Sequence, residues 1–314
     1  MGLFSKKRTS PPVQAAGYTA SGSHQAYASA SSQPRTAQPA QQFGLLPLNS
    51  YTAVHPSSQT YHIDVVAIHG LNGNAYTTWT NKRHQLWLQE FLPSALPGAR
   101  IYTFSYDSRI FSRSASGINE FAQSLLSELE KKRRTAADRQ RGIIFICHSL
   151  GGIVCKKALV VARQDPRYGN ILQYTKAVLF FGTPHRGSDQ ASIGSVIFNI
   201  FNNVISVTVP DRYLAKARQD LVALLKYQNQ TLTDLSEAFR IQSKVLEIVS
   251  FYESASSPPF NKLLVTRDSA RIGVGSEQLV SLPYNHSDMC KIEDTSSKAY
   301  VILVHTCRKY GMRR

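Results

Sequence analysis

Cysteine is scarce in this sequence, and its few occurrences show no regular spacing. The 314 residues include 4 cysteines, namely Cys147, Cys155, Cys290 and Cys307. Disulfide-stabilised folds and cysteine zinc sites require cysteines in paired or evenly spaced arrays. The pattern therefore argues against structural disulfides and a zinc site, and it indicates a reduced, intracellular protein.

Acidic residues are absent from the start of the chain, where the first is Asp64. Residues 1–58 are rich in Ser, Ala, Gln and Pro and contain few large aliphatic side chains. Because such a stretch cannot bury enough surface to offset its ordering entropy, we expect a disordered tail over 1–58. Its basic run at 6–8 is also compatible with an organellar transit peptide, for instance a mitochondrial one. An apolar signal segment is missing, and Lys6 stands where a myristoylation motif needs Ser or Thr, so neither signal is predicted.

Two further motif classes are missing. No G-x-x-x-x-G-K-[ST] loop occurs, which excludes a P-loop NTPase. The formal net charge is +16, yet no nucleic-acid recognition motif accompanies it, so we expect no nucleic-acid partner. Basic clusters, such as residues 131–134 with Arg139 and Arg141, offer a face for anionic lipid at about 1 kcal/mol per well-placed residue. We therefore expect a protein that is cytoplasmic or peripheral to a membrane.

A candidate nucleophile is present at Ser149. The apolar run 143–146 leads into Cys147-His148-Ser149-Leu150-Gly151-Gly152, and a helical pattern follows. A serine at the tip of a strand–turn–helix is how α/β-hydrolases hold their nucleophile, because the tight turn lifts the hydroxyl clear of the sheet. The usual G-x-S-x-G pattern has Gly151 in its second glycine position but Cys147 in its first. Ser149 is therefore the predicted nucleophile of a variant motif.

A second turn precedes the serine and predicts an oxyanion hole. Residues 63–68 read as a buried strand that runs into His69-Gly70-Leu71-Asn72-Gly73. This fold places one oxyanion donor in such a turn, where Gly70 lets the substrate approach, and the other directly after the nucleophile. The N–H groups of Leu71 and Leu150 are thus the predicted donors. Each such donor is worth roughly 100- to 1,000-fold in rate.

Three of the 9 histidines are expected to lie near the serine without acting as the base. His69 and His148 precede Ser149 in the sequence and are expected to shape the two turns. His148 is also expected in the substrate site. His185 comes too early after the serine to be the base, because this fold runs from serine to acid to histidine. We expect His185 to line the substrate site.

The general base is expected late in the chain. His305 lies in a C-terminal helical pattern and is interpreted as structural. His286 lies in a polar, mobile loop after the apolar stretch 279–282. His286 is therefore the predicted base.

The acid that orients the base has two candidates. Glu253 directly follows the strand pattern at 245–252, which is where this fold carries its triad carboxylate. Asp268 follows a second strand-like run at 263–267 and is the alternative, while Asp107 precedes the serine and fits the order poorly. Glu253 is favoured as the acid. The non-catalytic alternative for either residue is a solvated carboxylate on the surface.

An apolar segment bears on the substrate. Residues 191–205 are mostly apolar, with asparagines at helical spacing, Asn199, Asn202 and Asn203. Three amides in hydrocarbon are costly, so a transmembrane span is not predicted. We expect a cap insertion over about 189–242 that also includes helices at about 211–228 and 231–241. An apolar cap suits acyl chains, and a helix that simply packs on the core is the alternative.

The motifs HGLNG, HSLGG, FFGTPHRGS, SFYE and NHSDMCK occur in this order. Together they resemble the lipase-like serine esterases of the α/β-hydrolase superfamily. This group includes serine-active-site-containing proteins and the hydrolase modules that open many fungal NACHT-type receptors. The resemblance covers roughly residues 60–310 and implies Ser149 as nucleophile, His286 as base and Glu253 as acid.

The predicted fold class is α/β, with one α/β-hydrolase domain over 59–312. It should have a mostly parallel central sheet, helices on both faces and the helical cap. The predicted function is hydrolysis of carboxylic esters, of lipids or other small acyl substrates, through an acyl-enzyme without metal or cofactor. The alternatives are a catalytically weak or inactive interaction and signalling module, and a lipid-remodelling acyltransferase.

Overall fold

The structure is a computed structural model that describes residues 42–49, 59–108, 117–187, 192–208, 230–259 and 261–312. Most of the predicted tail and the helix predicted at 211–228 lie outside these ranges. The helix predicted at 231–241 is present and spans residues 230–242.

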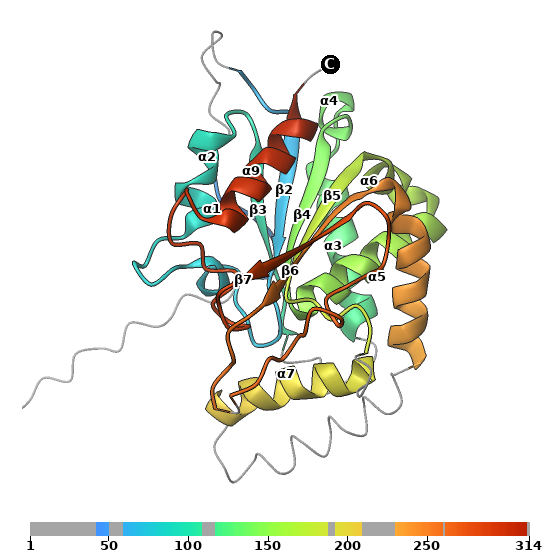
Figure 1. Cartoon of the computed structure of the whole chain (residues 1–314). Coiled ribbons are helices and arrows are strands. Elements are labelled where there is room, and N and C mark those ends of the chain that lie inside the picture. The colour runs from blue at the N-terminus through green and yellow to red at the C-terminus, as the bar shows by residue number, and fades with distance from the viewer. Residues whose placement is uncertain are drawn as a thin grey trace, which may run out of the picture. The chain divides into compact units, whose positions relative to one another are not determined.

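A seven-stranded sheet forms the centre of the domain, with the strand order β1-β3-β2-β4-β5-β6-β7 (Figure 1). The strands are β1 (Gly44–Pro47), β2 (Ile63–Ile68), β3 (Arg100–Ser105), β4 (Gly142–His148), β5 (Thr175–Phe181), β6 (Glu247–Glu253) and β7 (Glu277–Leu282). Only the edge strand β1 pairs antiparallel, with β3, and every other pairing is parallel. The continuous apolar runs of β2 and β4 are typical of parallel strands that are covered on both faces.

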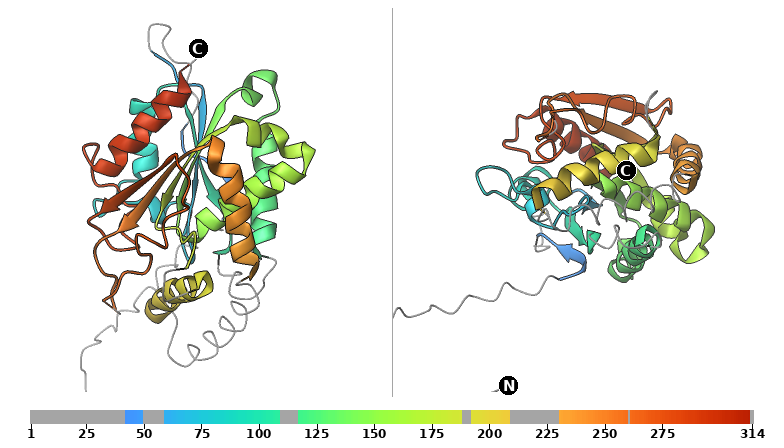
Figure 2. Two further views of the ribbon diagram at one scale, coloured as in Figure 1. Left: turned by 45° about the vertical axis from the view of Figure 1, so that its right-hand side comes forward. Right: turned by 90° about the horizontal axis from the view of Figure 1, so that it is seen from below.

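Helices cover both faces of the sheet (Figure 2). The longer ones are α3 (Gly117–Lys132), α5 (Leu150–Gln164), α7 (Ile193–Thr208) and α9 (Lys298–Gly311). Short α-helical segments are α1 (Trp87–Glu90), α2 (Leu92–Ala95), α4 (Ala136–Arg139) and α6 (Gly169–Tyr174). Single 3-10 turns are η1 (Thr77–Trp79), η3 (Pro166–Tyr168) and η4 (Ser243–Val245). Side chains of α3 and α5 pack on one face, while α1, α2 and α9 pack on the other.

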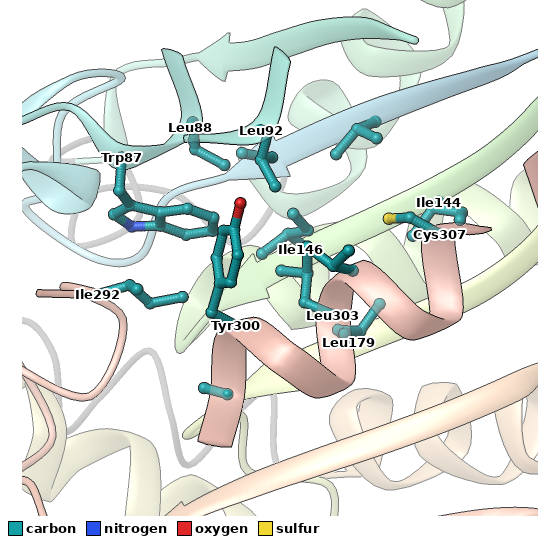
Figure 3. Packing of buried hydrophobic residues seen from close by; sticks show 14 of the residues in the cluster. Trp87, Leu88, Leu92, Ile144, Ile146, Leu179, Ile292, Tyr300, Leu303 and Cys307 are labelled. Atoms are coloured by element: carbon teal, nitrogen blue, oxygen red, sulfur yellow. The ribbon is translucent and has the colours of Figure 1, made fainter. Parts of the chain in front are cut away.

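Alternate residues of each strand enter the two cores, because successive side chains of a strand point to opposite faces. On the α9 face, Ile144 and Ile146 of β4 lie beside Leu303 and Cys307 of α9 (Figure 3). The intervening Phe145 belongs to the core on the other face. This arrangement is the α/β-hydrolase fold, and it confirms the predicted fold class.

The predicted start of the fold at residue 59 was wrong. Residues 44–47 form β1 and pair with β3 in register from Gly44 opposite Ser105 to Pro47 opposite Tyr102. Leu45 is 3% exposed and packs in the core with α3. The polar composition averaged over residues 1–58 gives no sign of this four-residue apolar run. The run is buried and hydrogen-bonded only because it pairs with a strand that is distant in the sequence.

Part of the predicted basic face is instead buried. Arg133 and Arg141 both point to Asp64, at 2.6 and 3.0 Å. Arg100 binds the same carboxylate at 2.6 Å. A buried charge requires a partner of opposite sign, so Asp64 draws these side chains inward. They are therefore unavailable to anionic lipid.

The helix α7 lies across the end of the sheet at which β4 meets α5 (Figure 2). Ile193, Ile197 and Phe201 pack against Leu150 and neighbouring residues of α5. The amide of Asn203 donates to the carbonyl of Pro258 at 2.7 Å. Within the described ranges, no helix is both long and apolar enough to cross a membrane.

Candidate active site

Ser149 occupies a strained turn between β4 and α5. Its backbone has φ 52° and ψ −121°, a conformation that L-residues rarely adopt and that is held by the surrounding structure. The Ser149 N–H donates to the carbonyl of Phe181 at 2.9 Å. The Ser149 carbonyl accepts from Thr183 Oγ1 at 3.0 Å. These two bonds to β5 and its following loop keep the serine at the tip of the turn.

Two glycines bring the turn after β2 against the serine. A Cβ on Gly70 would lie 2.9 Å from Cβ of Ser149. A Cβ on Gly151 would collide with the carbonyl oxygens of Ile68 and His69. Real Cβ atoms do not approach other atoms so closely, so glycine at both positions permits the contact between the two predicted motifs.

His286 contacts the serine directly. Its Nε2 lies 3.0 Å from Oγ of Ser149, and the two side chains belong to residues that are each 2% exposed. The backbone N–H of His286 donates to Oγ of Ser257 at 3.2 Å. His286 is therefore buried and hydrogen-bonded, whereas the next residue of the loop, Ser287, is exposed.

His148 fixes the same loop from the other side. Its Nε2 donates to the carbonyl oxygen of His286 at 2.9 Å. Burial, with the nearby His286, lowers the pKa of His148 to about 3, so the ring is neutral and carries its proton on Nε2.

His69 shapes the turn after β2, as predicted. It stacks on Tyr106 with ring centroids 4.3 Å apart, and its Nδ1 donates to the carbonyl of Gly70 at 2.9 Å. Burial lowers the pKa of His69 to about 4. This ring is therefore neutral at physiological pH.

Glu253 is the carboxylate beside His286. It ends β6 and is 0% exposed, and its Oε2 lies 3.2 Å from Nδ1 of His286. This pair is in contact without a well-aligned hydrogen bond. Catalytic contacts often tighten only when substrate binds.

The other oxygen of Glu253 is held by backbone groups that the sequence did not indicate. Its Oε1 accepts from the N–H groups of Leu264 and Val265. The strand predicted at 263–267 is absent, and this irregular segment instead supplies donors to the carboxylate. No local pattern predicts such a role, because it depends on where β6 ends in space.

Asp268, the alternative acid, lies apart from the histidine. Its side chain is exposed, and its carbonyl oxygen accepts from Nε of Arg186 at 2.8 Å. Among the described residues the structure pairs only Glu253 with His286. Asp107 follows β3 and is partly buried.

The predicted oxyanion donors belong to the two turns that meet at the serine. Leu150 is the first residue of α5, where the backbone N–H groups have no helical acceptor and the helix dipole favours negative charge. Leu71 follows Gly70, whose Cα lies against the Ser149 side chain. No hydrogen bond engages either N–H within the described segments.

A cavity of about 370 Å³ opens beside the two turns. Leu71 and His148 line it, together with polar side chains that include Asn72, Thr77, Asn285 and Lys291. His185 does not line this cavity. It lines a second cavity, of about 450 Å³, together with Lys156.

Comparison with known proteins relates the chain to hydrolases. A family model described as "Putative serine esterase (DUF676)" matches residues 57–246. The zebrafish (Danio rerio) protein "Protein SERAC1" is 27% identical over 79% of this chain and 39% of its own length. "Triacylglycerol lipase 2" of Saccharomyces cerevisiae is 26% identical over 60% of this chain and 52% of its own length. The chain thus spans about two fifths to one half of these curated relatives.

Solved structures show the same kind of likeness at low identity. The monoacylglycerol lipase of Paleococcus ferrophilus is 13% identical, with a TM-score of 0.45, over 81% of this chain and 98% of the lipase. A hydrolase from Oleispira antarctica is 10% identical, with a TM-score of 0.42, over 78% of this chain and 91% of that one.

Proposed function

The chain belongs to the "Putative serine esterase (DUF676)" family, and from this premise we propose that it is a serine hydrolase that cleaves carboxylic esters. One observation carries the proposal. Oγ of Ser149, the imidazole of His286 and the carboxylate of Glu253 form a continuous line of contacts at 3.0 and 3.2 Å. Nucleophile, general base and orienting acid stand in this relation in serine hydrolases.

In the proposed reaction, Oγ of Ser149 attacks the ester carbonyl carbon while Nε2 of His286 accepts the hydroxyl proton. The carbonyl electron pair moves to oxygen and forms an oxyanion. Its collapse breaks the ester C–O bond, and the imidazolium returns the proton to the leaving alcohol. Water then attacks the acyl-serine through the same proton transfers and releases the carboxylic acid.

Glu253 orients His286 and stabilises its charged form. The backbone donors at Leu264 and Val265 hold one carboxylate oxygen, which leaves the other directed at Nδ1 of the ring. A buried carboxylate held in this way is already beside the ring when the imidazolium forms, so its charge stabilises the transition state.

The N–H groups of Leu71 and Leu150 are the oxyanion donors of this proposal. The close approach of Gly70 to Ser149 supports the assignment, because it brings the N–H of the next residue near the reacting carbonyl. The position of Leu150 at the start of α5 supports it independently.

The substrate of this proposal is a lipid or another acyl ester. A yeast relative is named as a triacylglycerol lipase, and this likeness supports a lipid ester. The adjacent cavity combines polar side chains with apolar surface, which suits both the alcohol and the acyl portions of the ester.

Labelling with a fluorophosphonate probe tests the proposal. Wild type should be labelled, and Ser149→Ala and His286→Ala should both lose labelling, because the probe reacts only with an activated serine. Ser94→Ala, which changes an exposed serine of α2, should label like wild type. If well-folded wild type is not labelled, the chain is an interaction module. An acyltransferase would also be labelled, and product analysis with water and an added alcohol as acceptors separates it from an esterase.

A further inference from the structure

The second cavity, of about 450 Å³, is lined mainly by basic and polar side chains. They come from α5, the loop after β5, the start of α7 and the helix over 230–242, and they include Lys156, His185, Arg186, Ser192, Ser236 and Arg240. No residue of this lining belongs to the cavity beside Ser149. A single water occupies about 30 Å³, so the space accommodates a ligand of several heavy atoms.

Within the described part of the chain, Lys156 is a buried amine without an anionic partner. It is 1% exposed, and among the described residues its only hydrogen bond runs from Nζ to Oγ of Ser236, at 3.2 Å. No carboxylate of the described ranges forms an ion pair with it. Burial lowers the pKa of Lys156 to about 7. A buried ammonium is costly unless an anion compensates it.

His185 adds an unsatisfied ring to the same cavity. It is 3% exposed, and neither ring nitrogen has a hydrogen-bond partner within the described segments. Its backbone N–H donates to the carbonyl of Ser269 at 2.7 Å, and its ring meets Phe180 edge-on at 4.5 Å. The ring is thus fixed in place while its polar atoms lack partners, which is expensive unless a ligand supplies them.

The remaining charges of the cavity favour an anion. Arg186 and Arg240 contribute two further guanidinium groups. The one carboxylate in the lining, Glu237, already binds Nε of Arg240 at 2.9 Å. Among the described lining residues, Lys156 and Arg186 therefore have no carboxylate partner. A phosphate has enough oxygens to accept hydrogen bonds from both groups at once.

We infer that this cavity binds the phosphate group of a small phosphorylated molecule or lipid headgroup. Lys156 Nζ contacts the phosphate oxygens, His185 donates one ring N–H, and Arg186 binds from the rim. The site is distinct from the proposed esterase centre and does not depend on its activity.

Isothermal titration of the whole chain at constant ionic strength tests this inference, with inorganic phosphate and glycerol 3-phosphate as probes. Wild type should bind one equivalent of at least one probe. Lys156→Met should weaken that binding about 10- to 100-fold, because hydrogen bonds to charged groups are lost. Lys157→Met, which removes the adjacent and more exposed amine, should bind like wild type.

A loss of binding must be distinguished from a loss of folding. Methionine keeps an unbranched chain at position 156, so the thermal midpoint of Lys156→Met should not fall. His185→Phe keeps a ring but lacks its N–H donor, and it provides an independent variant that should also weaken binding. Tighter binding of inorganic phosphate identifies a free anion. Tighter binding of glycerol 3-phosphate, with binding to phosphatidic acid vesicles, identifies a headgroup. Absence of saturable binding, equal binding of acetate, or unchanged binding by Lys156→Met overturns the inference.

Discussion

Nε2 of His148 donates a hydrogen bond of 2.9 Å to the carbonyl oxygen of His286, so the residue before the candidate nucleophile holds the loop of the candidate base. The two imidazole rings lie 5.2 Å apart, centroid to centroid. One ring therefore positions the other without touching the reacting atoms.

His148→Ala should lower kcat for a chromogenic ester about 10- to 100-fold with a smaller change in KM, because His286 loses an anchor. His148→Gln retains a donor and should recover part of the rate. Since the pKa of His148 is about 3, its ring stays neutral above about pH 4 and adds no ionisation to the rate profile between pH 5 and 9. An unchanged kcat in His148→Ala would remove the positioning role.

Glu253→Gln should reduce kcat at least 100-fold, because a neutral amide cannot stabilise the imidazolium of His286. Asp268→Asn should stay within about twofold of wild type, since that side chain is exposed and lies apart from His286. Steady-state kinetics on both variants makes the comparison. The reverse order of effects contradicts the assignment of the acid.

Gly70→Ala should abolish ester hydrolysis, because its Cβ would lie 2.9 Å from Cβ of Ser149 and must displace one of the two turns. Gly169→Ala is the matched control. A Cβ on Gly169 meets nothing within 4 Å, and its φ of −55° suits alanine. The control should keep full activity and gain up to about 1 kcal/mol in free energy of unfolding. If Gly70→Ala hydrolysed esters at nearly the wild-type rate, the close contact between Gly70 and Ser149 would not be required for activity.

Lys156 should make stability depend on pH. Its pKa is about 7 in the folded protein and about 10.4 when unfolded, so the unfolded state binds more protons between these values. The free energy of unfolding should therefore rise with pH from about 7 to 10, by about 1 kcal/mol per unit. This contribution is missing in Lys156→Met, and the difference between the two urea-unfolding curves isolates it.

Within the described ranges, the titratable and charged groups around Lys156 are His185 and Arg186 on the loop after β5, and Glu237 and Arg240 on the helix over 230–242. Cys155 is its neighbour on α5. Wild type and Lys156→Met share all these groups. Their titration therefore largely cancels in the difference between the two free energies of unfolding. Parallel curves for wild type and Lys156→Met would contradict a lowered lysine pKa. These unfolding measurements are made without phosphate, because a bound anion raises that pKa.

The sequence by itself determined the features that depend on neighbouring residues. The apolar runs at 63–68 and 143–146 predicted two central strands, and the small residues around Ser149 predicted the strand–turn–helix. Chain order then selected His286 among the histidines. These features follow from the side-chain period of a strand and the steric demands of a tight turn, which act over a few residues.

Only the tertiary structure decided which groups meet across the fold. Glu253 and Asp268 both follow plausible strand patterns, and they differ in that one ends β6 under His286 while the other is exposed. β1 gains its stability from pairing with β3, and His185 lines a cavity together with Lys156. Burial and pairing depend on residues far apart in the chain, and no local pattern encodes those distances.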